Sequence, residues 1–174
     1  MHIPKSKNRK ALIIVDVQPF FIKKRDSKIL ENILKLLKQE TYDCYANIVF
    51  FSEGNPEWEE QEHWKCPEEY AVTVPEVMEA IRDKKVLHIK KSTKSAFKGE
   101  PKLEPWLKEN KIHEVHIIGF DTNDCVFVTA NEAFDLGFKS YVIEEATGSS
   151  EGEKYRREAI DILRELNMTN HSVV

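Results

Sequence analysis

Five short apolar segments of the chain predict buried β-strands. The first, 11–15 (ALIIV), is an unbroken apolar run, which is typical of a strand covered on both faces in a parallel sheet. It ends at a charged residue, Asp16. Comparable segments lie at 47–51, 86–89, 115–119 and 141–143.

Amphipathic segments between the strands predict helices. Ser27 is suited to cap a helix whose apolar residues recur at helical spacing, and Pro75 is suited to the first turn of another. Further helices are expected at 103–110, 124–136 and 151–166. This alternation predicts an α/β protein with one domain over 1–174. Its architecture would be three layers, α/β/α, with helices on both faces of a mainly parallel sheet of five to six strands.

A polar segment, 53–69, interrupts the alternation. It is rich in Trp and Glu and contains Pro56 and Pro67, so it is expected to leave the core as a long loop. Loops of this length are often functional. We therefore expect substrate choice to lie in this segment or in a partner subunit.

Composition and charge exclude several classes of protein. The 174 residues carry 26 basic and 30 acidic side chains, a net charge of -4, without the basic excess that a nucleic acid attracts. We therefore expect no nucleic-acid partner. Stretches free of charged residues are far shorter than the roughly 18 residues that span a bilayer, so no membrane association is expected either. The basic start runs into an apolar segment too short for a signal-peptide core, which predicts a cytoplasmic protein.

The three cysteines are widely separated and fit neither a disulfide framework nor a paired-cysteine zinc site. Reduced thiols are expected in the cytoplasm, and any of them is available for chemistry. Cys44 and Cys66 are interpreted as structural. Cys125 differs because it stands at the predicted start of a helix, where free N–H groups and the helix dipole favour a thiolate.

Three reactive side chains are expected at one edge of the sheet. In open parallel sheets, ligands bind beyond the carboxyl ends of the strands, and Asp16, Lys91 and Cys125 follow three such ends. Taken alone, Cys125 is as easily a core residue, Asp16 a turn former and Lys91 a solvated cation. Their coincidence favours a nucleophilic site. Lys91 would lower the pKa of the thiol, and Asp16 would accept its proton.

Other chemistries fail on spacing. A haloacid-type phosphatase needs a second Asp where Gln18 stands, and a cysteine phosphatase needs Arg where Asn131 stands. Glycine-rich phosphate and dinucleotide loops are absent from the sequence, as is a paired-His zinc helix. A metal site at His113 and His116 is disfavoured.

Four segments of the sequence resemble the isochorismatase-like cysteine hydrolases, a family that includes nicotinamidases and N-carbamoylsarcosine amidases. They are ALIIVDVQ at 11–18, KSTKSAF at 91–97, GFDTNDCVFVTA at 119–130 with AFDLG at 133–137, and EATGSSEGEKYRREAIDIL at 145–163. Together they cover nearly the whole chain in the family's order and spacing.

The resemblance implies a catalytic triad of Asp16, Lys91 and Cys125. It implies that the oxyanion rests on the backbone N–H groups of Asp121 and Cys125, and that the peptide bond between Phe120 and Asp121 is cis. Lys90 competes for the lysine role, but neighbouring residues on a strand face opposite ways, and the spacing to 95–97 favours Lys91.

Departures from the family pattern bear on metal and substrate. The metal motif of nicotinamidases is replaced by EGNP at 53–56, where Glu53 could ligate a cation but Asn55 is a poor ligand, and His63 is the only further candidate. We expect no metal and no cofactor. Four aromatic side chains are expected to line the pocket for a flat, small-molecule substrate, with plain core packing as the alternative: Phe20, Phe21, Trp58 and Trp64.

The leading hypothesis is a metal-independent cysteine hydrolase that cleaves a C–N bond of a small amide or carbamoyl substrate through a thioester. A metal-assisted nicotinamidase and a catalytically idle interaction protein remain as alternatives. Cys125 argues against vinyl ether hydrolysis, because true isochorismatases of this family act without the cysteine. The resemblance also implies a homodimer or homotetramer.

Overall fold

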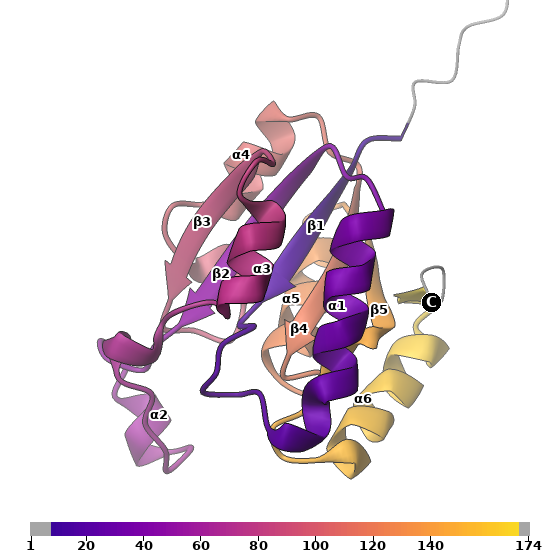
Figure 1. The fold of residues 1–174 in the computed structure, drawn as a ribbon. Helices are drawn as coiled ribbons and strands as arrows, with labels where there is room; N and C mark the ends of the chain where they lie inside the picture. The colour runs from indigo at the N-terminus through magenta and orange to yellow at the C-terminus, as the bar shows by residue number, and fades with distance from the viewer. Residues whose placement is uncertain (1–7, 171–174) are drawn as a thin grey trace, which may run out of the picture.

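One parallel sheet forms the centre of the molecule. In the computed structural model, which describes residues 8–170, the strand order is β3-β2-β1-β4-β5-β6, and every neighbouring pair is parallel (Figure 1). The expected parallel sheet of five to six strands is confirmed. The strands are β1 (Lys10–Val15), β2 (Cys44–Phe50), β3 (Val86–Lys91), β4 (Glu114–Phe120), β5 (Lys139–Gly148) and β6 (Thr169–Asn170).

Helices cover both faces of the sheet, which confirms the three-layer architecture (Figure 1). Side chains alternate along β1, so that Leu12 and Ile14 pack on one face while Ile13 and Val15 pack on the other. The first face is covered by α1 (Ser27–Gln39) and α3 (Pro75–Ile81). The second face is covered by α4 (Leu103–Glu109), α5 (Cys125–Asp135) and α6 (Glu153–Glu165). Within residues 8–170, no helix is long and apolar enough to cross a membrane.

Several boundaries differ from the sequence predictions. Strand β5 runs well beyond 141–143, because the buried carboxylate of Glu144 pairs with the Arg164 guanidinium on α6 and so tolerates a position inside the sheet layer. Helix α1 begins at Ser27 itself, with Asp26 in the cap position. The polar segment 53–69 includes the short helix α2 (Glu57–Glu60), and the expectation that it leaves the core is only partly right, because Trp58 and Cys66 within it are buried in the core.

The close approach of β1 and β4 requires a glycine. At Gly119, φ is +114°, and a Cβ added there would lie 1.9 Å from the carbonyl oxygen of Val15. No other residue type fits without moving a strand. Gly119 therefore allows the segment that follows β4 to start directly beside the end of β1.

Candidate active site

The strand order places the sequence-predicted residues at one edge of the sheet. Asp16 follows β1, Lys91 ends β3, and Cys125 begins α5 shortly after β4. Strands β1 and β4 are neighbours at the point where the order reverses, β3-β2-β1 on one side and β4-β5-β6 on the other. Ligands of open α/β sheets bind at such a switch point.

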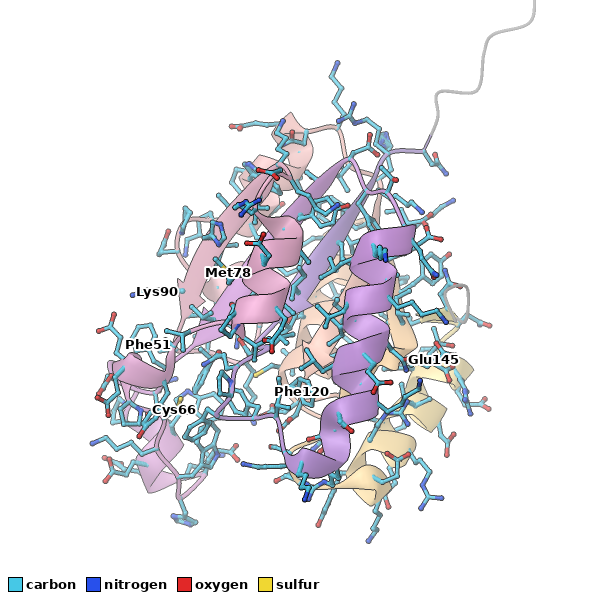
Figure 2. The ribbon with its side chains drawn as sticks, viewed as in Figure 1. Phe51, Cys66, Met78, Lys90, Phe120 and Glu145 are labelled. Carbon is cyan, nitrogen blue, oxygen red and sulfur yellow. The ribbon has the colours of Figure 1, made fainter. Side chains whose placement is uncertain are left out.

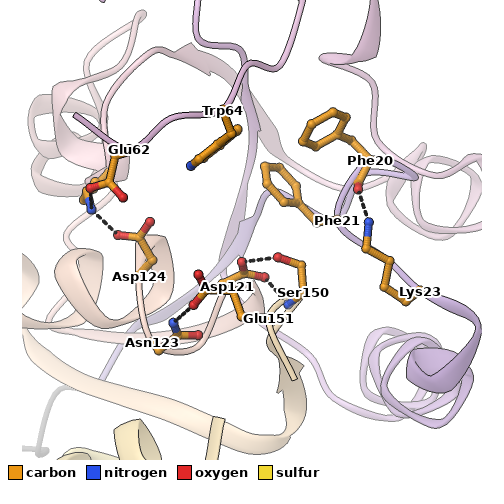
Figure 3. Close-up of a pocket in the computed structure, with 11 residues that line it drawn as sticks. Phe20, Phe21, Lys23, Glu62, Trp64, Asp121, Asn123, Asp124, Ser150 and Glu151 are labelled. Atoms are coloured by element: carbon orange, nitrogen blue, oxygen red, sulfur yellow. Dashed lines mark hydrogen bonds and ion pairs between the residues drawn. The ribbon is translucent and has the colours of Figure 1, made fainter. Parts of the chain in front are cut away.

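A cavity of about 410 Å³ opens at this edge (Figure 3). Aromatic side chains of Phe20, Phe21 and Trp64 lie on one side of it, and Asp121 lies across from them with Ser150. The rest of the lining is polar and charged: Lys23, Glu62, Lys94, Asn123, Asp124 and Glu151.

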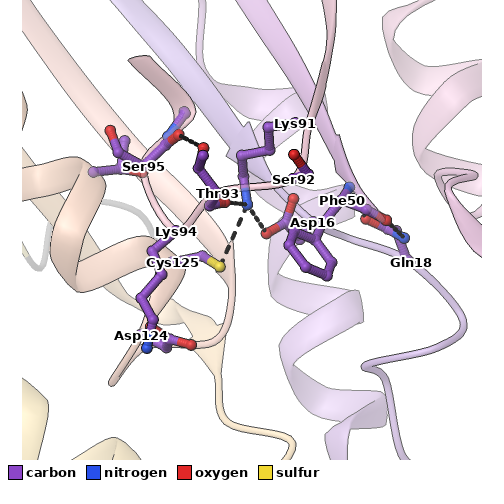
Figure 4. A network of polar contacts seen from close by, with 12 residues as sticks. Asp16, Gln18, Phe50, Lys91, Ser92, Thr93, Lys94, Ser95, Asp124 and Cys125 are labelled. Carbon is purple, nitrogen blue, oxygen red and sulfur yellow. Dashed lines mark hydrogen bonds and ion pairs between the residues drawn. The ribbon is translucent and has the colours of Figure 1, made fainter. Parts of the chain in front are cut away.

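Asp16, Lys91 and Cys125 form one contact network (Figure 4). None of the three is among the residues that line the cavity, but Asp124, which lines it, directly precedes Cys125. The Lys91 ammonium lies 2.7 Å from Asp16 Oδ2 and 3.4 Å from Cys125 Sγ. All three residues are buried, and Cys125 is 6% exposed. Asp16 Oδ1 has no hydrogen-bond partner among the described residues. The arrangement therefore holds a thiol, an ammonium group and a carboxylate oxygen that is free to accept a proton.

The surroundings of Lys91 fix the direction of its side chain. Its ammonium also donates to the carbonyl of Thr93 at 2.9 Å and lies 4.8 Å from the centre of the Phe50 ring. Lys90 points away from the sheet, as Figure 2 shows, and pairs with Glu68 at 3.0 Å. Of the two candidate lysines, Lys91 is the one that enters the site.

Burial controls the protonation of the network. Burial raises the pKa of Cys125 above its usual range, although the Lys91 ammonium acts in the opposite direction. Burial likewise raises the pKa of Asp16 against the effect of Lys91. Burial disfavours the charge of Lys91, but Asp16 and Cys125 outweigh it, so the pKa of Lys91 is raised. The resting cysteine is therefore a thiol, in contrast to the thiolate expected from its position at a helix start.

Two free backbone donors lie next to the thiol. The peptide bond between Phe120 and Asp121 is cis, as the resemblance implies. The N–H groups of Asp121 and Cys125 donate no hydrogen bond to another described residue. Thr122 anchors the turn between them, since its N–H and its hydroxyl both donate to the carbonyl of Gly148. The turn therefore presents donors that can hold an oxyanion.

Two positioning residues were not assigned a role from the sequence. The Gln18 amide donates to the carbonyls of Phe50 and Tyr70 and accepts the N–H of Phe50 at 2.6 Å, which fixes the segment after Asp16 to the end of β2. Thr129 on α5 accepts the N–H of Ala96. Both lie within the segments that carry the family resemblance. The spacing of these segments marks both residues as part of the family pattern. Their hydrogen-bond partners are distant in the sequence and are known only from the folded structure.

Three of the four predicted aromatic residues line the cavity, and Trp58 does not. Trp58 is buried, packs against Phe50 with ring centres 4.8 Å apart, and donates its indole N–H to the carbonyl of Ser92. Its ring also lies 5.0 Å from that of Trp64. Trp58 thus supports the aromatic wall from behind and does not form part of its surface.

The residues that replace the nicotinamidase metal motif do not fit a metal. The Glu53 carboxylate accepts the N–H of Glu68 at 2.6 Å, and the Asn55 amide donates to the carbonyl of Ser92. His63 is exposed. Over residues 8–170, no group of three or more His, Cys, Asp or Glu side chains could hold a metal ion. A zinc or iron site needs such a group of ligands.

Comparisons with known proteins find related sequences and the same fold. The isochorismatase domain model matches residues 10–171. An uncharacterized isochorismatase family protein of Bacillus subtilis, YrdC, is 32% identical over 146 residues, which are 81% of this chain and 74% of the relative. An isochorismatase-like hydrolase from Alkaliphilus metalliredigens shares the fold with a TM-score of 0.75 at 19% identity, over 92% of each chain. A nicotinamidase from Staphylococcus aureus shares it with a TM-score of 0.72 at 22% identity, over 92% of this chain and 96% of the other.

Proposed function

Since the chain belongs to the isochorismatase family, we propose that it is a metal-independent cysteine hydrolase that cleaves the C–N bond of a small amide or carbamoyl compound. One observation carries the proposal. The buried Lys91 ammonium bridges Cys125 Sγ and Asp16 Oδ2, and the turn that leads into Cys125 carries two free backbone donors and lines a cavity with Asp121 and Asp124. A nucleophile, a base and an oxyanion site are the groups that acyl transfer requires.

In the first step, Cys125 Sγ attacks the carbonyl carbon of the substrate and its proton passes to Asp16. The unpartnered Oδ1 of Asp16 is the acceptor. Lys91 remains protonated and stabilises the negative charge on sulfur. Burial raises the pKa of both the thiol and the carboxyl, so the transfer takes place between two groups whose neutral forms the site favours.

The tetrahedral oxyanion is held by the N–H groups of Asp121 and Cys125. When it collapses, the C–N bond breaks and Asp16 returns the proton to nitrogen, so ammonia or an amine leaves and a thioester remains on Cys125. A water molecule then gives a proton to Asp16 and attacks the thioester. The C–S bond breaks, Asp16 returns its proton to the departing sulfur to restore the thiol, and the acid product leaves.

A panel of small amides, nicotinamide included, tests the proposal through ammonia release with and without added divalent metal. We expect turnover of at least one amide without metal. Cys125→Ala should reduce it by at least about 10³-fold, as removal of a catalytic nucleophile does. The matched control is Cys44→Ala. Cys44 is also buried, but it lies at the start of β2, at the end of the strand away from the site, so this variant should retain activity. Full activity of Cys125→Ala, or turnover only with metal, would contradict the proposal.

An aldehyde analogue of a substrate gives a second readout. It should form a covalent thiohemiacetal with the wild type and none with Cys125→Ala, as measured by the mass of the intact protein. Such an adduct would identify Cys125 as the group that attacks a carbonyl carbon, even if the natural substrate is not in the panel.

A further inference from the structure

The cavity beside Cys125 has an excess of acidic groups. Four carboxyl groups line it against two ammonium groups. The Lys94 ammonium forms ion pairs with Glu62 at 2.9 Å and Asp124 at 3.1 Å. Its positive charge is therefore offset by two carboxylates that line the same cavity. The other ammonium, on the exposed Lys23, donates to the carbonyl of Phe20. The cavity thus favours a positively charged ligand over a negatively charged one.

Asp121 is the cavity carboxylate that no described lysine neutralises and whose residue also belongs to the proposed oxyanion site, whereas Asp124 is paired with Lys94. Its backbone N–H is one of the two donors assigned to the oxyanion. Oδ1 accepts the N–H of Ser150 at 2.8 Å and Oδ2 accepts the Ser150 hydroxyl, which fix the carboxylate on the cavity wall. Asp121 forms no ion pair with any described residue. Burial raises its pKa to about 6, against the hydrogen bonds from Ser150.

An aromatic wall faces this carboxylate across the cavity (Figure 3). Phe20 stacks with Trp64 at 6.1 Å between ring centres, and Phe21 meets Trp64 edge to face. Aromatic faces attract ammonium groups, and quaternary ammonium groups most typically bind among several rings. A neutral flat amide would contact the rings and leave the carboxylate without a cationic partner. A cationic amide uses both.

We propose that this site selects small amides that carry a fixed positive charge near the carbonyl, with Asp121 as the residue that determines this preference. The proposal rests on the proposed function, since it assigns a substrate class to the same site. Asp121 binds the cation directly, while Phe20, Phe21 and Trp64 enclose it.

An isosteric pair of probes tests the preference. Trimethylammonioacetamide and 3,3-dimethylbutanamide have nearly the same shape and differ in charge. Binding of each is measured by calorimetry to the Cys125→Ala variant, and kcat/KM of each is measured with the wild type. We expect the cationic amide to bind at least about tenfold more tightly. This preference should increase as the pH rises through about 6, because Asp121 then ionises.

Asp121→Asn, made in the same Cys125→Ala background, should reduce the cationic-to-neutral ratio of affinities at least about tenfold and remove its dependence on pH. The ratio is the readout because general damage to the oxyanion turn affects both amides alike. The matched control is Asp135→Asn, an exposed carboxylate at the far end of α5, which should leave the ratio unchanged.

Equal binding of the two amides, or a ratio that Asp121→Asn does not change, would overturn the proposed preference. Either result would leave the proposed function intact as long as the wild type hydrolyses any amide of the panel. Conversely, if the wild type hydrolyses none of the amides, the proposed function is refuted. The ratio of the affinities for the cationic and the neutral amide would still measure the charge preference of the cavity.

Discussion

The Lys91 ammonium lies 2.7 Å from Asp16 Oδ2, and both side chains are fully buried. Two charges taken out of water depend on each other, because either one alone would remain in the core without compensation. The pair therefore has a structural role in addition to the role proposed for it in proton transfer.

Loss of one partner should destabilise the fold more than loss of both. Asp16→Asn and Lys91→Met should each lower the free energy of unfolding by about 3–5 kcal/mol, whereas the double variant should recover much of that loss. Asn is chosen at position 16 because φ there is 49°, which Asn tolerates. Urea denaturation measures all three variants, and simple addition of the two single losses would contradict the coupling.

The same substitution tests the proposed chemistry separately. Asp16→Asn should reduce kcat/KM on any amide substrate by roughly 10²–10⁴-fold, because the amide cannot accept the thiol proton. The assay is run well below the melting temperature of the variant, so that unfolding does not contribute. Retained activity would remove Asp16 from the mechanism.

The stability of the protein should depend on the ionisation of Asp121. The pKa of Asp121 is about 6 in the folded protein against 3.8 for an ordinary aspartate, so the folded state binds this proton more tightly than the unfolded state. The stability that neutral Asp121 contributes is complete below about pH 3.8 and is lost as the pH rises through about 6. Relative to Asp121→Asn, the wild type should lose at most about 3 kcal/mol over this range.

Chemical denaturation of both proteins from pH 4 to 8 measures this difference. Ser150→Ala serves as a companion variant. Because the hydrogen bonds from Ser150 lower the pKa of Asp121, removing the hydroxyl should move the pH-dependent loss to higher pH. A difference that does not vary with pH would show that Asp121 has the same charge in the folded and unfolded chain.

Lys94 should hold the segment 53–69 over the cavity. It joins Glu62 on that segment to Asp124, and its ammonium lies 5.3 Å from the centre of the Trp58 ring. Lys94→Gln should increase hydrogen exchange of residues 57–65 several-fold while costing only about 1 kcal/mol or less in global stability. Lys98→Gln, which breaks the exposed pair with Glu132, is the matched control and should not affect that segment.

Gly119 should be intolerant of any side chain. An alanine Cβ there would lie 1.9 Å from the Val15 carbonyl oxygen, so Gly119→Ala should cost several kcal/mol or prevent folding. Gly137→Ala is the control, because its φ is also positive, at +89°, but nothing lies within 4 Å of the added Cβ. That variant should cost only about 1 kcal/mol. Similar thermal denaturation of the two variants would contradict the steric argument.

Much of the architecture could be predicted from hydrophobic patterning, because buried parallel strands form unbroken apolar runs. The convergence of Asp16, Lys91 and Cys125 was predictable for a related reason, since the carboxyl ends of parallel strands meet at one edge. The extent of β5 was not, because a buried Glu144 is acceptable only once Arg164 folds back beside it.

The protonation state of Cys125 could also not be predicted from the sequence. Its position at a helix start and the nearby lysine both favour the thiolate, and the depth of burial that reverses the balance is a property of the folded chain. The same holds for the aromatic residues. Composition identifies Trp58 and Trp64 equally, and the path of the segment 53–69 decides which one faces the cavity.

Strand β3 is the outer strand of the sheet on its side, and its last residue is Lys91. Asp16 and Cys125 follow the two central strands, β1 and β4. Local unfolding of β3 would therefore separate Lys91 from Asp16 and Cys125 while the two central strands stay paired. The lysine of the proposed triad therefore belongs to an outer strand, and its salt bridge to Asp16 joins that strand to the centre of the sheet.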